Sequence, residues 1–178
     1  MKRKIISLIT LAITLILSVC CLVSCQKSGE TKAILQSATE DQIVMSIEET
    51  DGNANAFDAL KSLRNQDLLS FDYTTGSYGA FITSINGKAN AVSESTANSS
   101  KGYSWTLYTS DMDNAYDTKT VTIGNTVCGE SAFGASGLTV KEGELYVWVY
   151  AYYEYTWSWR KGRIVCEQAR FITGKEQK

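Results

Sequence analysis

The fold is decided by the stretch Leu145-Tyr146-Val147-Trp148-Val149-Tyr150-Ala151-Tyr152-Tyr153, in which aliphatic and aromatic residues alternate. Side chains of a strand point alternately to its two faces. The stretch therefore predicts a strand with one aliphatic face, which we expect to be core, and one aromatic sheet face. The aliphatic face carries Leu145, Val147, Val149 and Ala151, and the aromatic face carries Tyr146, Trp148, Tyr150 and Tyr152.

Outward from this stretch, further runs of β-branched and aromatic residues between turn residues predict more strands. Asn86-Gly87 supplies the two residues tolerant of positive φ that a tight hairpin turn requires. The polar stretch 92–100 is expected to be a solvated loop. The expected strands span residues 42–48, 69–73, 80–85, 103–108 and 119–127, and a C-terminal hairpin with arms 153–159 and 164–172 flanks Arg160-Lys161-Gly162-Arg163.

One amphipathic helix is expected after the first of these strands, which ends at the turn Asp51-Gly52-Asn53. Either Asn53 or Asn55 can cap its N-terminus. Its apolar residues recur at the spacing of one helix face and are Ala56, Ala59, Leu60 and Leu63. Together the patterns predict a mainly β, α+β domain with one short helix lying on a sheet.

The N-terminus combines a charged segment with an apolar one. Three cations, Lys2, Arg3 and Lys4, precede an apolar run over residues 5–23. The run ends at Leu22-Val23-Ser24-Cys25, which matches the lipobox of bacterial lipoproteins: an aliphatic residue, two small or modest residues and a cysteine. We expect cleavage before Cys25 and lipidation of its thiol. The alternative is an uncleaved transmembrane helix, since about 20 residues suffice to span a bilayer.

Cleavage at this point divides the chain into three parts. Residues 1–24 are the signal peptide, residues 25–41 a lipidated tether, and residues 42–178 the β-rich domain. The mature chain keeps 14 of the 17 cations against 19 acidic residues, a net charge of −5. It gives no indication of nucleic-acid binding. We expect it to be held by lipid on the extracytoplasmic side of the cell membrane.

Two absences exclude several kinds of catalytic site. The chain has no histidine and no proline, so a Ser-His-Asp or Cys-His site and a histidine-ligated metal centre are excluded. Cys20 and Cys21 leave with the signal peptide, and Cys25 is expected to carry lipid. The remaining pair, Cys128 and Cys166, forms either one disulfide or two buried thiols.

One loop is rich in oxygen ligands. Asp111, Asp113, Asn114 and Asp117 offer side chains suited to calcium, but their spacing does not match an EF-hand loop, and a solvated turn is the alternative. We therefore expect a protein that is not an enzyme, with no catalytic residues, no bound metal and no cofactor.

Four segments, taken in order, resemble the transcobalamin-like C-terminal β-domain, a family found in intrinsic factor, transcobalamin and many bacterial surface lipoproteins. The segments are Asn55-Ala56-Phe57-Asp58-Ala59-Leu60, Tyr78-Gly79-Ala80-Phe81-Ile82-Thr83-Ser84-Ile85-Asn86-Gly87, Gly102-Tyr103-Ser104-Trp105-Thr106-Leu107-Tyr108 and Leu138-Thr139-Val140-Lys141-Glu142-Gly143-Glu144-Leu145-Tyr146-Val147-Trp148. The resemblance covers residues 42–153 and implies a β-grasp-like fold, a mixed sheet wrapped on one helix. The hairpin over residues 154–172 is an addition to the family pattern.

In the vitamin-binding members of this family the β-domain covers one face of a corrinoid, and a helical domain, which we expect this chain to lack, covers the other. The resemblance therefore implies capture of a cobalamin-like corrinoid through an open aromatic face or with a partner, such as a helical-domain protein or a transporter. Flat macrocycles bind well to aromatic faces. The expected ligand-binding residues are Trp105, Tyr108, Tyr146, Trp148 and Tyr150. The alternative for Trp105 and Trp148 is an ordinary place in the sheet and core.

Two other functions stay open. The aromatic run over residues 150–159 suits glycan binding or adhesion, because Trp and Tyr stack on sugar rings; the alternative is that these rings only pair across the hairpin. A third hypothesis is a stalk or protein-interaction module that binds a partner at a sheet edge or at the aromatic hairpin.

Overall fold

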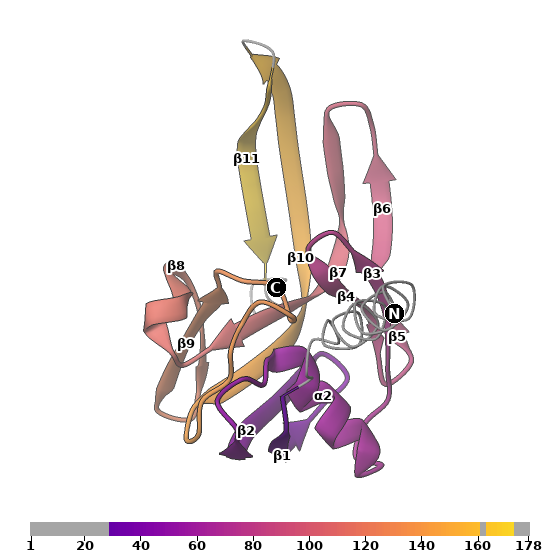
Figure 1. Ribbon diagram of the computed structural model, residues 1–178. Coiled ribbons are helices and arrows are strands. Elements are labelled where there is room, and N and C mark those ends of the chain that lie inside the picture. The colour runs from indigo at the N-terminus through magenta and orange to yellow at the C-terminus, as the bar shows by residue number, and fades with distance from the viewer. Residues whose placement is uncertain (1–28, 161–162, 173–178) are drawn as a thin grey trace, which may run out of the picture.

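The computed structural model describes residues 29–160 and 163–172, with the side chains of residues 29–158. Figure 1 shows helix α2 lying across one end of a β-sheet, near β1 and β2, and two hairpins that project at the opposite end. The predicted signal peptide and Cys25 lie outside the described residues. Within the described ranges, no helix has both the length and the apolar character needed to cross a membrane.

The described residues form two antiparallel sheets and one α-helix, α2 (Ala56–Asn65). The main sheet has the order β1 (Thr31–Ala38), β2 (Gln42–Thr50), β10 (Leu145–Arg160), β7 (Ser99–Thr109), β9 (Thr126–Ser131) and β8 (Ala115–Ile123). In addition, β11 (Arg163–Ile172) pairs with β10, and β6 (Ala91–Ser95) pairs with β7. The smaller sheet contains β3 (Phe71–Gly76), β4 (Gly79–Ile85) and β5 (Lys88–Ala89), and a short 3-10 turn, η1 (Met112–Asn114), precedes β8.

Strand β10 is central and unusually long. Its first half, from Leu145 to Val149, pairs with β2, and its second half pairs with β11 from Tyr152 onward. Its other edge pairs with β7 almost throughout. The strand therefore belongs to the body of the domain at one end and to a projecting ribbon of β6, β7, β10 and β11 at the other.

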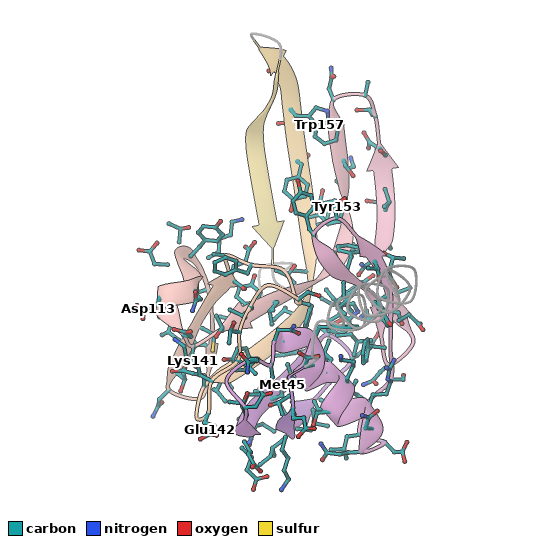
Figure 2. The ribbon with its side chains drawn as sticks, in the orientation of Figure 1. Met45, Asp113, Lys141, Glu142, Tyr153 and Trp157 are labelled. Atoms are coloured by element: carbon teal, nitrogen blue, oxygen red, sulfur yellow. The ribbon has the colours of Figure 1, made fainter. Side chains whose placement is uncertain are left out.

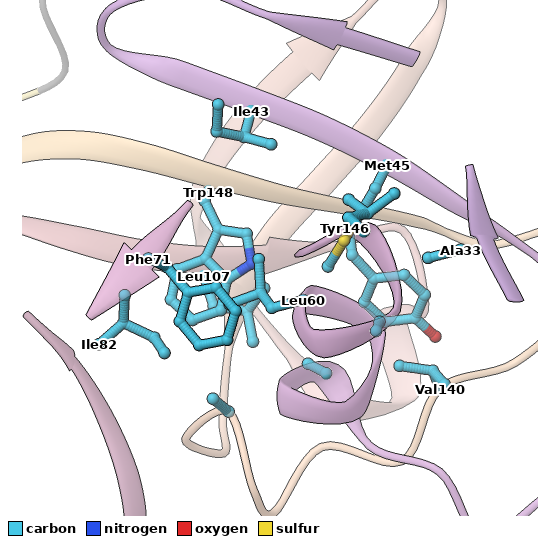
Figure 3. Packing of buried hydrophobic residues seen from close by; sticks show 14 of the residues in the cluster. Ala33, Ile43, Met45, Leu60, Phe71, Ile82, Leu107, Val140, Tyr146 and Trp148 are labelled. Atoms are coloured by element: carbon cyan, nitrogen blue, oxygen red, sulfur yellow. The ribbon is translucent and has the colours of Figure 1, made fainter. Parts of the chain in front are cut away.

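Both faces of the first half of β10 are buried. The aliphatic face packs in a small core with Val44, Tyr108 and Cys128, which Val121 and Ile123 of β8 help to cover. The aromatic face packs in a larger core beneath α2, where Figure 3 shows Tyr146 and Trp148 close to Leu60. This larger core also contains Ala33, Ile43, Met45, Ala59, Leu63, Phe71, Ile82, Trp105 and Leu107.

The expectation of an open aromatic face is thus corrected. Tyr146 is 0% exposed and Trp148 3% exposed, because α2 and the smaller sheet lie over them. The prediction of a core on the aliphatic face is confirmed. On the aromatic face, Tyr146 and Trp148 are core as well, whereas Tyr150 and Tyr152 are partly exposed.

Helix α2 starts where the sequence predicts it. Asn55 is the N-cap: its side chain accepts a hydrogen bond from the backbone N–H of Asp58 at 3.0 Å, and the Asp58 carboxylate accepts the N–H of Asn55 at 3.1 Å. This reciprocal capping box satisfies two N–H groups that the first turn leaves without helical partners. Ala56, Ala59 and Leu60 then turn into the core.

Several other boundaries differ from expectation. The predicted tether contains strand β1, whose Ala33 is fully buried, so the domain begins near Thr31 rather than Gln42. The predicted loop 92–100 belongs to the β6–β7 hairpin, whose polar composition reflects exposure. The expected single strand 119–127 is a hairpin, because Gly124 adopts positive φ and turns the chain between β8 and β9. Every described strand pair is antiparallel, so the expected mixed sheet is wrong.

Replacement of Asn55 by alanine tests the helix cap. We expect Asn55→Ala to lower the free energy of unfolding by about 1 kcal/mol, because the N–H of Asp58 loses its acceptor. Denaturant unfolding followed by circular dichroism measures the change. Asn53→Ala is the matched control, since its side chain only donates to the Asp51 carbonyl at 3.4 Å on the surface. An equal loss of stability in both variants would contradict the role of Asn55 as the N-cap.

Candidate functional site

A hollow of about 230 Å3 opens beside β7 and is lined largely by aromatic and aliphatic residues. We call it the aromatic hollow. Its lining comes from β4, β7, β9, the loop after β9 and β10, and comprises Ala80, Phe81, Ile82, Ser104, Trp105, Thr106, Leu107, Glu130, Ser131, Phe133, Gly134, Ala135, Trp148 and Tyr155.

The hollow lies at a gap in strand pairing. Along its outer edge, β7 pairs with β6 up to Tyr103 and with β9 only at Tyr108 and Thr109. Residues 104–107 therefore have no strand partner on this edge among the described residues. In place of a strand, the Asn90 side chain accepts the N–H of Trp105 at 3.0 Å, and the carbonyl of Lys88 accepts its indole N–H at 2.8 Å.

The lining of the hollow includes both exposed and buried rings. Phe81 is 58% exposed and Phe133 is 50% exposed, although both are large apolar side chains. Trp105 and Trp148 belong to the buried core. Exposed apolar rings beside a hollow are typical of a surface that another molecule covers.

Two polar groups of the hollow are buried. A Glu130 carboxylate oxygen lies 3.2 Å from the Lys119 ammonium group, which balances its charge. The indole N–H of Trp148 is buried and has no hydrogen-bond acceptor among the described residues. Buried N–H groups usually have a partner, so this donor is a notable feature of the site.

The hollow contains two of the five expected ligand-binding residues, Trp105 and Trp148. Tyr146 is in the core with its hydroxyl group accepting the backbone N–H of Lys141 at 2.8 Å. Tyr108 is buried on the opposite face of the sheet. Tyr150 is partly exposed, donates to the carbonyl of Ala89, and has no part in lining the hollow.

The remaining aromatic residues pair with one another along the ribbon. The ring of Tyr103 stacks on Tyr150 at 5.6 Å between centroids and meets Tyr152 edge-on at 5.5 Å. Because Tyr103 lies on β7 and its partners lie on β10, these are cross-strand contacts. Figure 2 shows Tyr153 and Trp157 on the projecting part of β10, remote from Lys141.

Sequence reasoning missed Phe81, Phe133 and Glu130. A signal for Phe81 exists, because Phe81 and Ile82 are consecutive apolar residues of one strand and must point to opposite faces. Ile82 is buried, so Phe81 points outward. Phe133 and Glu130 lie at the hollow only because tertiary contacts bring β9 and the following loop there. No local pattern in the sequence indicates this position.

The titratable groups of the small core are neutral at physiological pH. Burial, reinforced by the nearby Glu130 carboxylate, raises the pKa of Tyr108 to about 12. Burial likewise raises the pKa of Cys128 to about 11, so its free thiol is a poor nucleophile. Cys128 is a free thiol in this structure, which favours the two-thiol alternative over a disulfide with Cys166, whose own side chain lies outside the described side chains.

In the oxygen-rich loop, the Asp111 carboxylate is already bound by neighbouring side chains. Asp111 is buried and lies 2.6 Å from the Lys141 ammonium group, and it accepts a hydrogen bond from Asn114 at 2.7 Å. Burial acts to raise the pKa of Asp111, but the bonds from Lys141 and Asn114 outweigh it and hold the pKa below its ordinary value. Within residues 29–160 and 163–172, no three His, Cys, Asp or Glu side chains group as metal ligands would.

A ridge bounds the hollow where β4 begins. The backbone N–H of Ala80 donates to the Ser136 hydroxyl at 2.9 Å. Gly79 has a φ of +91°, and a Cβ atom added there would lie 2.6 Å from the Ser136 Cβ. The absence of a side chain at Gly79 therefore lets the start of β4 lie close to the Ser136 side chain in the loop after β9.

Comparisons of the chain with protein-family models, with curated proteins and with solved structures give no match. The resemblance to the transcobalamin-like β-domain therefore rests on the sequence segments alone.

A glycine substitution tests the ridge. We expect Gly79→Ala to destabilise the protein by about 1–3 kcal/mol, because the new Cβ adds a clash to an unfavourable φ. Gly87→Ala is the matched control, since Gly87 has a φ of +80° but open space around it. Thermal unfolding compares the two variants. An equal loss of stability would show that the contact with Ser136 is unimportant.

The ion pair between Asp111 and Lys141 predicts a pH-dependent loss of stability. Its lowered pKa means that the Asp111 carboxylate stabilises the fold above its unfolded pKa, near 3.9, and loses this effect as pH falls through its lower folded value. We expect Lys141→Gln to lower the free energy of unfolding more at pH 7, where Asp111 is ionised, than at pH 3. Urea unfolding at both pH values measures this difference.

The exposed pair between Lys32 and Glu48 supplies the control for this measurement. Because both of its side chains are exposed, Lys32→Gln should change the free energy of unfolding at pH 7 less than Lys141→Gln does. A cost for Lys141→Gln that stays constant from pH 7 to pH 3 would argue against the ion pair.

Proposed function

We propose that this protein is a surface-anchored, non-enzymatic binding lipoprotein whose aromatic hollow receives one face or edge of a flat, partly apolar ligand. The first ligand to test is a cobalamin-like corrinoid, which the resemblance to the transcobalamin-like, β-grasp-like family suggests. The exposure of Phe81 and Phe133 beside the hollow is the observation that carries the proposal.

These two rings support binding for an energetic reason. Apolar surface left in water is unfavourable by roughly 25 cal/mol per Å2, and covering it contributes that free energy to association. Aromatic rings also suit conjugated ligands, because they can stack on them or meet them edge-on. Buried Trp105 and Trp148 hold this part of the site in place.

The size of the hollow favours partial contact. At about 230 Å3 it is smaller than the roughly 300–1,000 Å3 of sites that enclose a small-molecule ligand. A corrinoid would thus be contacted on one side only, and a second surface would be needed to cover it. A helical-domain protein or a membrane transporter is the partner that this arrangement favours.

The proposed lipid anchor supports such sharing. Only five residues, 26–30, separate Cys25 from strand β1, so the six residue steps from Cys25 to Thr31 span at most about 22 Å. A lipid on Cys25 would hold the domain close to the membrane and raise its effective concentration for a membrane partner to about the millimolar range.

A second candidate is a protein-interaction or adhesion module, favoured by the ribbon that projects away from β1 and β2. Besides the pairing of β7 with β10, two further contacts link its hairpins. The backbone N–H of Trp157 donates to the carbonyl of Asn98, and its indole N–H donates to the carbonyl of Ala97, both at 2.9 Å. A linked ribbon of this kind can present its tip to a partner at a distance from the membrane.

Tryptophan fluorescence tests corrinoid binding, because two of the four tryptophans line the hollow. We expect cyanocobalamin to quench the tryptophan fluorescence of the full-length protein in detergent, with saturation at micromolar concentration. A micromolar Kd corresponds to a binding free energy on the order of −8 kcal/mol. The double variant Phe81→Ala, Phe133→Ala should weaken binding about tenfold or more, because it removes about 1.4 kcal/mol or more of contact.

Two controls accompany the titration. Tyr116→Ala removes an equally exposed ring on β8 and should bind as the unaltered protein does. A parallel titration of free N-acetyltryptophanamide gives the apparent quenching that arises only because the corrinoid absorbs light. Quenching that does not saturate, or that is equal in the double variant, would refute corrinoid binding at this hollow.

A further inference from the structure

A second cavity, of about 540 Å3, lies across the ridge from the aromatic hollow, with Ala80 lining both. We call it the polar cleft. Its walls come from the start of α2, from β3, from the beginning of β4 and from the loop before β10, and comprise Gly29, Asn53, Asn55, Phe57, Asp58, Lys61, Tyr73, Thr75, Gly79, Ala80, Ser136 and Thr139.

Neutral amides and hydroxyls supply most of its polar groups. Asn53, Asn55, Thr75, Ser136 and Thr139 each carry groups that can donate and accept hydrogen bonds. The Asn55 side-chain oxygen accepts the N–H of Asp58, and its NH2 group has no partner among the described residues. Mixed donors and acceptors of this kind match hydroxyl groups, which need both.

The charges of the cleft balance within the protein. The Lys61 ammonium group lies 2.6 Å from the buried Asp58 carboxylate. The capping box engages the N–H groups of Asn55 and Asp58, and the N–H groups of Ala56 and Phe57 donate to the carbonyls of Leu138 and Ala135. The N–H groups at the positive end of the helix dipole therefore already have acceptors. The cleft therefore favours a neutral ligand over an anion.

Two aromatic rings form its apolar wall. Phe57 of α2 and Tyr73 of β3 meet edge-on with centroids 4.7 Å apart. Packing against Phe57 fixes the Tyr73 ring, yet Tyr73 is 43% exposed. An exposed, fixed ring next to hydroxyl and amide groups suits a ligand with an apolar face and a polar edge.

From these groups we propose that the polar cleft binds the ring of a neutral saccharide. The C–H face of a pyranose ring lies on Tyr73, and the hydroxyl groups of the sugar form hydrogen bonds with Asn55, Thr75 and Ser136. The volume falls within the roughly 300–1,000 Å3 of small-molecule sites. This site is separate from the proposed corrinoid-contacting hollow and independent of it.

Saturation-transfer difference NMR on the full-length protein in detergent tests the proposal. The probes are four neutral disaccharides: maltose, cellobiose, lactose and N,N′-diacetylchitobiose. We expect at least one of them to give a saturable signal that is strongest for ring C–H protons, because these protons face Tyr73. No signal from any of the four would overturn the proposal.

Two variants then locate the site. Tyr73→Ala should weaken binding about tenfold or more, whereas Tyr73→Phe, which keeps the ring and its packing, should retain most of it. Tyr116→Ala, an exposed tyrosine on β8, is the matched control and should bind normally. Circular dichroism confirms that each variant is folded.

The outcomes separate this site from the aromatic hollow. The Phe81→Ala, Phe133→Ala double variant should keep the saccharide signal, because neither ring lines the cleft. A saccharide signal that survives Tyr73→Ala, or that is lost on removal of the two phenylalanines, would place binding elsewhere and refute the proposal.

Discussion

The rest of this structure depends on the burial of both faces of β10. Over residues 146–149 the strand is hydrogen-bonded to β2 on one edge and β7 on the other, with no exposed face. An antiparallel strand commonly leaves one face to water. Here one face needs α2 and the smaller sheet as a cover, and the other needs the hairpin of β8 and β9. The order of the surrounding elements follows from those two requirements.

The length of β10 then produces the projecting ribbon. Its pairing with β2 stops at Val149, but the strand continues to Arg160, and β7 follows it. Beyond the body of the domain, β11 and β6 take over as partners. Because β6 and β9 pair with different parts of β7, residues 104–107 are left without a strand partner on that edge among the described residues. The aromatic hollow lies at that interruption.

The two cavities on either side of the Gly79–Ser136 ridge differ in chemistry because different elements line them. Core rings from β7 and β10 reach the aromatic hollow, and exposed phenylalanines lie beside it. The capped start of α2 gives the polar cleft its amides and its internally balanced charge. The loop between β9 and β10 lines both cavities: residues 133–135 line the aromatic hollow, and Ser136 and Thr139 line the polar cleft.

Local patterns in the sequence determined the capped helix, the Asn86-Gly87 turn and the strand after Leu145, because each depends on residues close together in the chain. The same patterns could not tell a solvent-facing aromatic face from a buried one, since alternation assigns residues to faces but does not say what covers a face. Tertiary structure alone decided that Tyr146 and Trp148 are core, and that Phe81 and Phe133, 52 residues apart, meet at one hollow. It also made a strand of the expected tether, because β1 gains its stability from pairing with β2 and from burying Ala33, and neither contact is visible in its own weakly apolar residues.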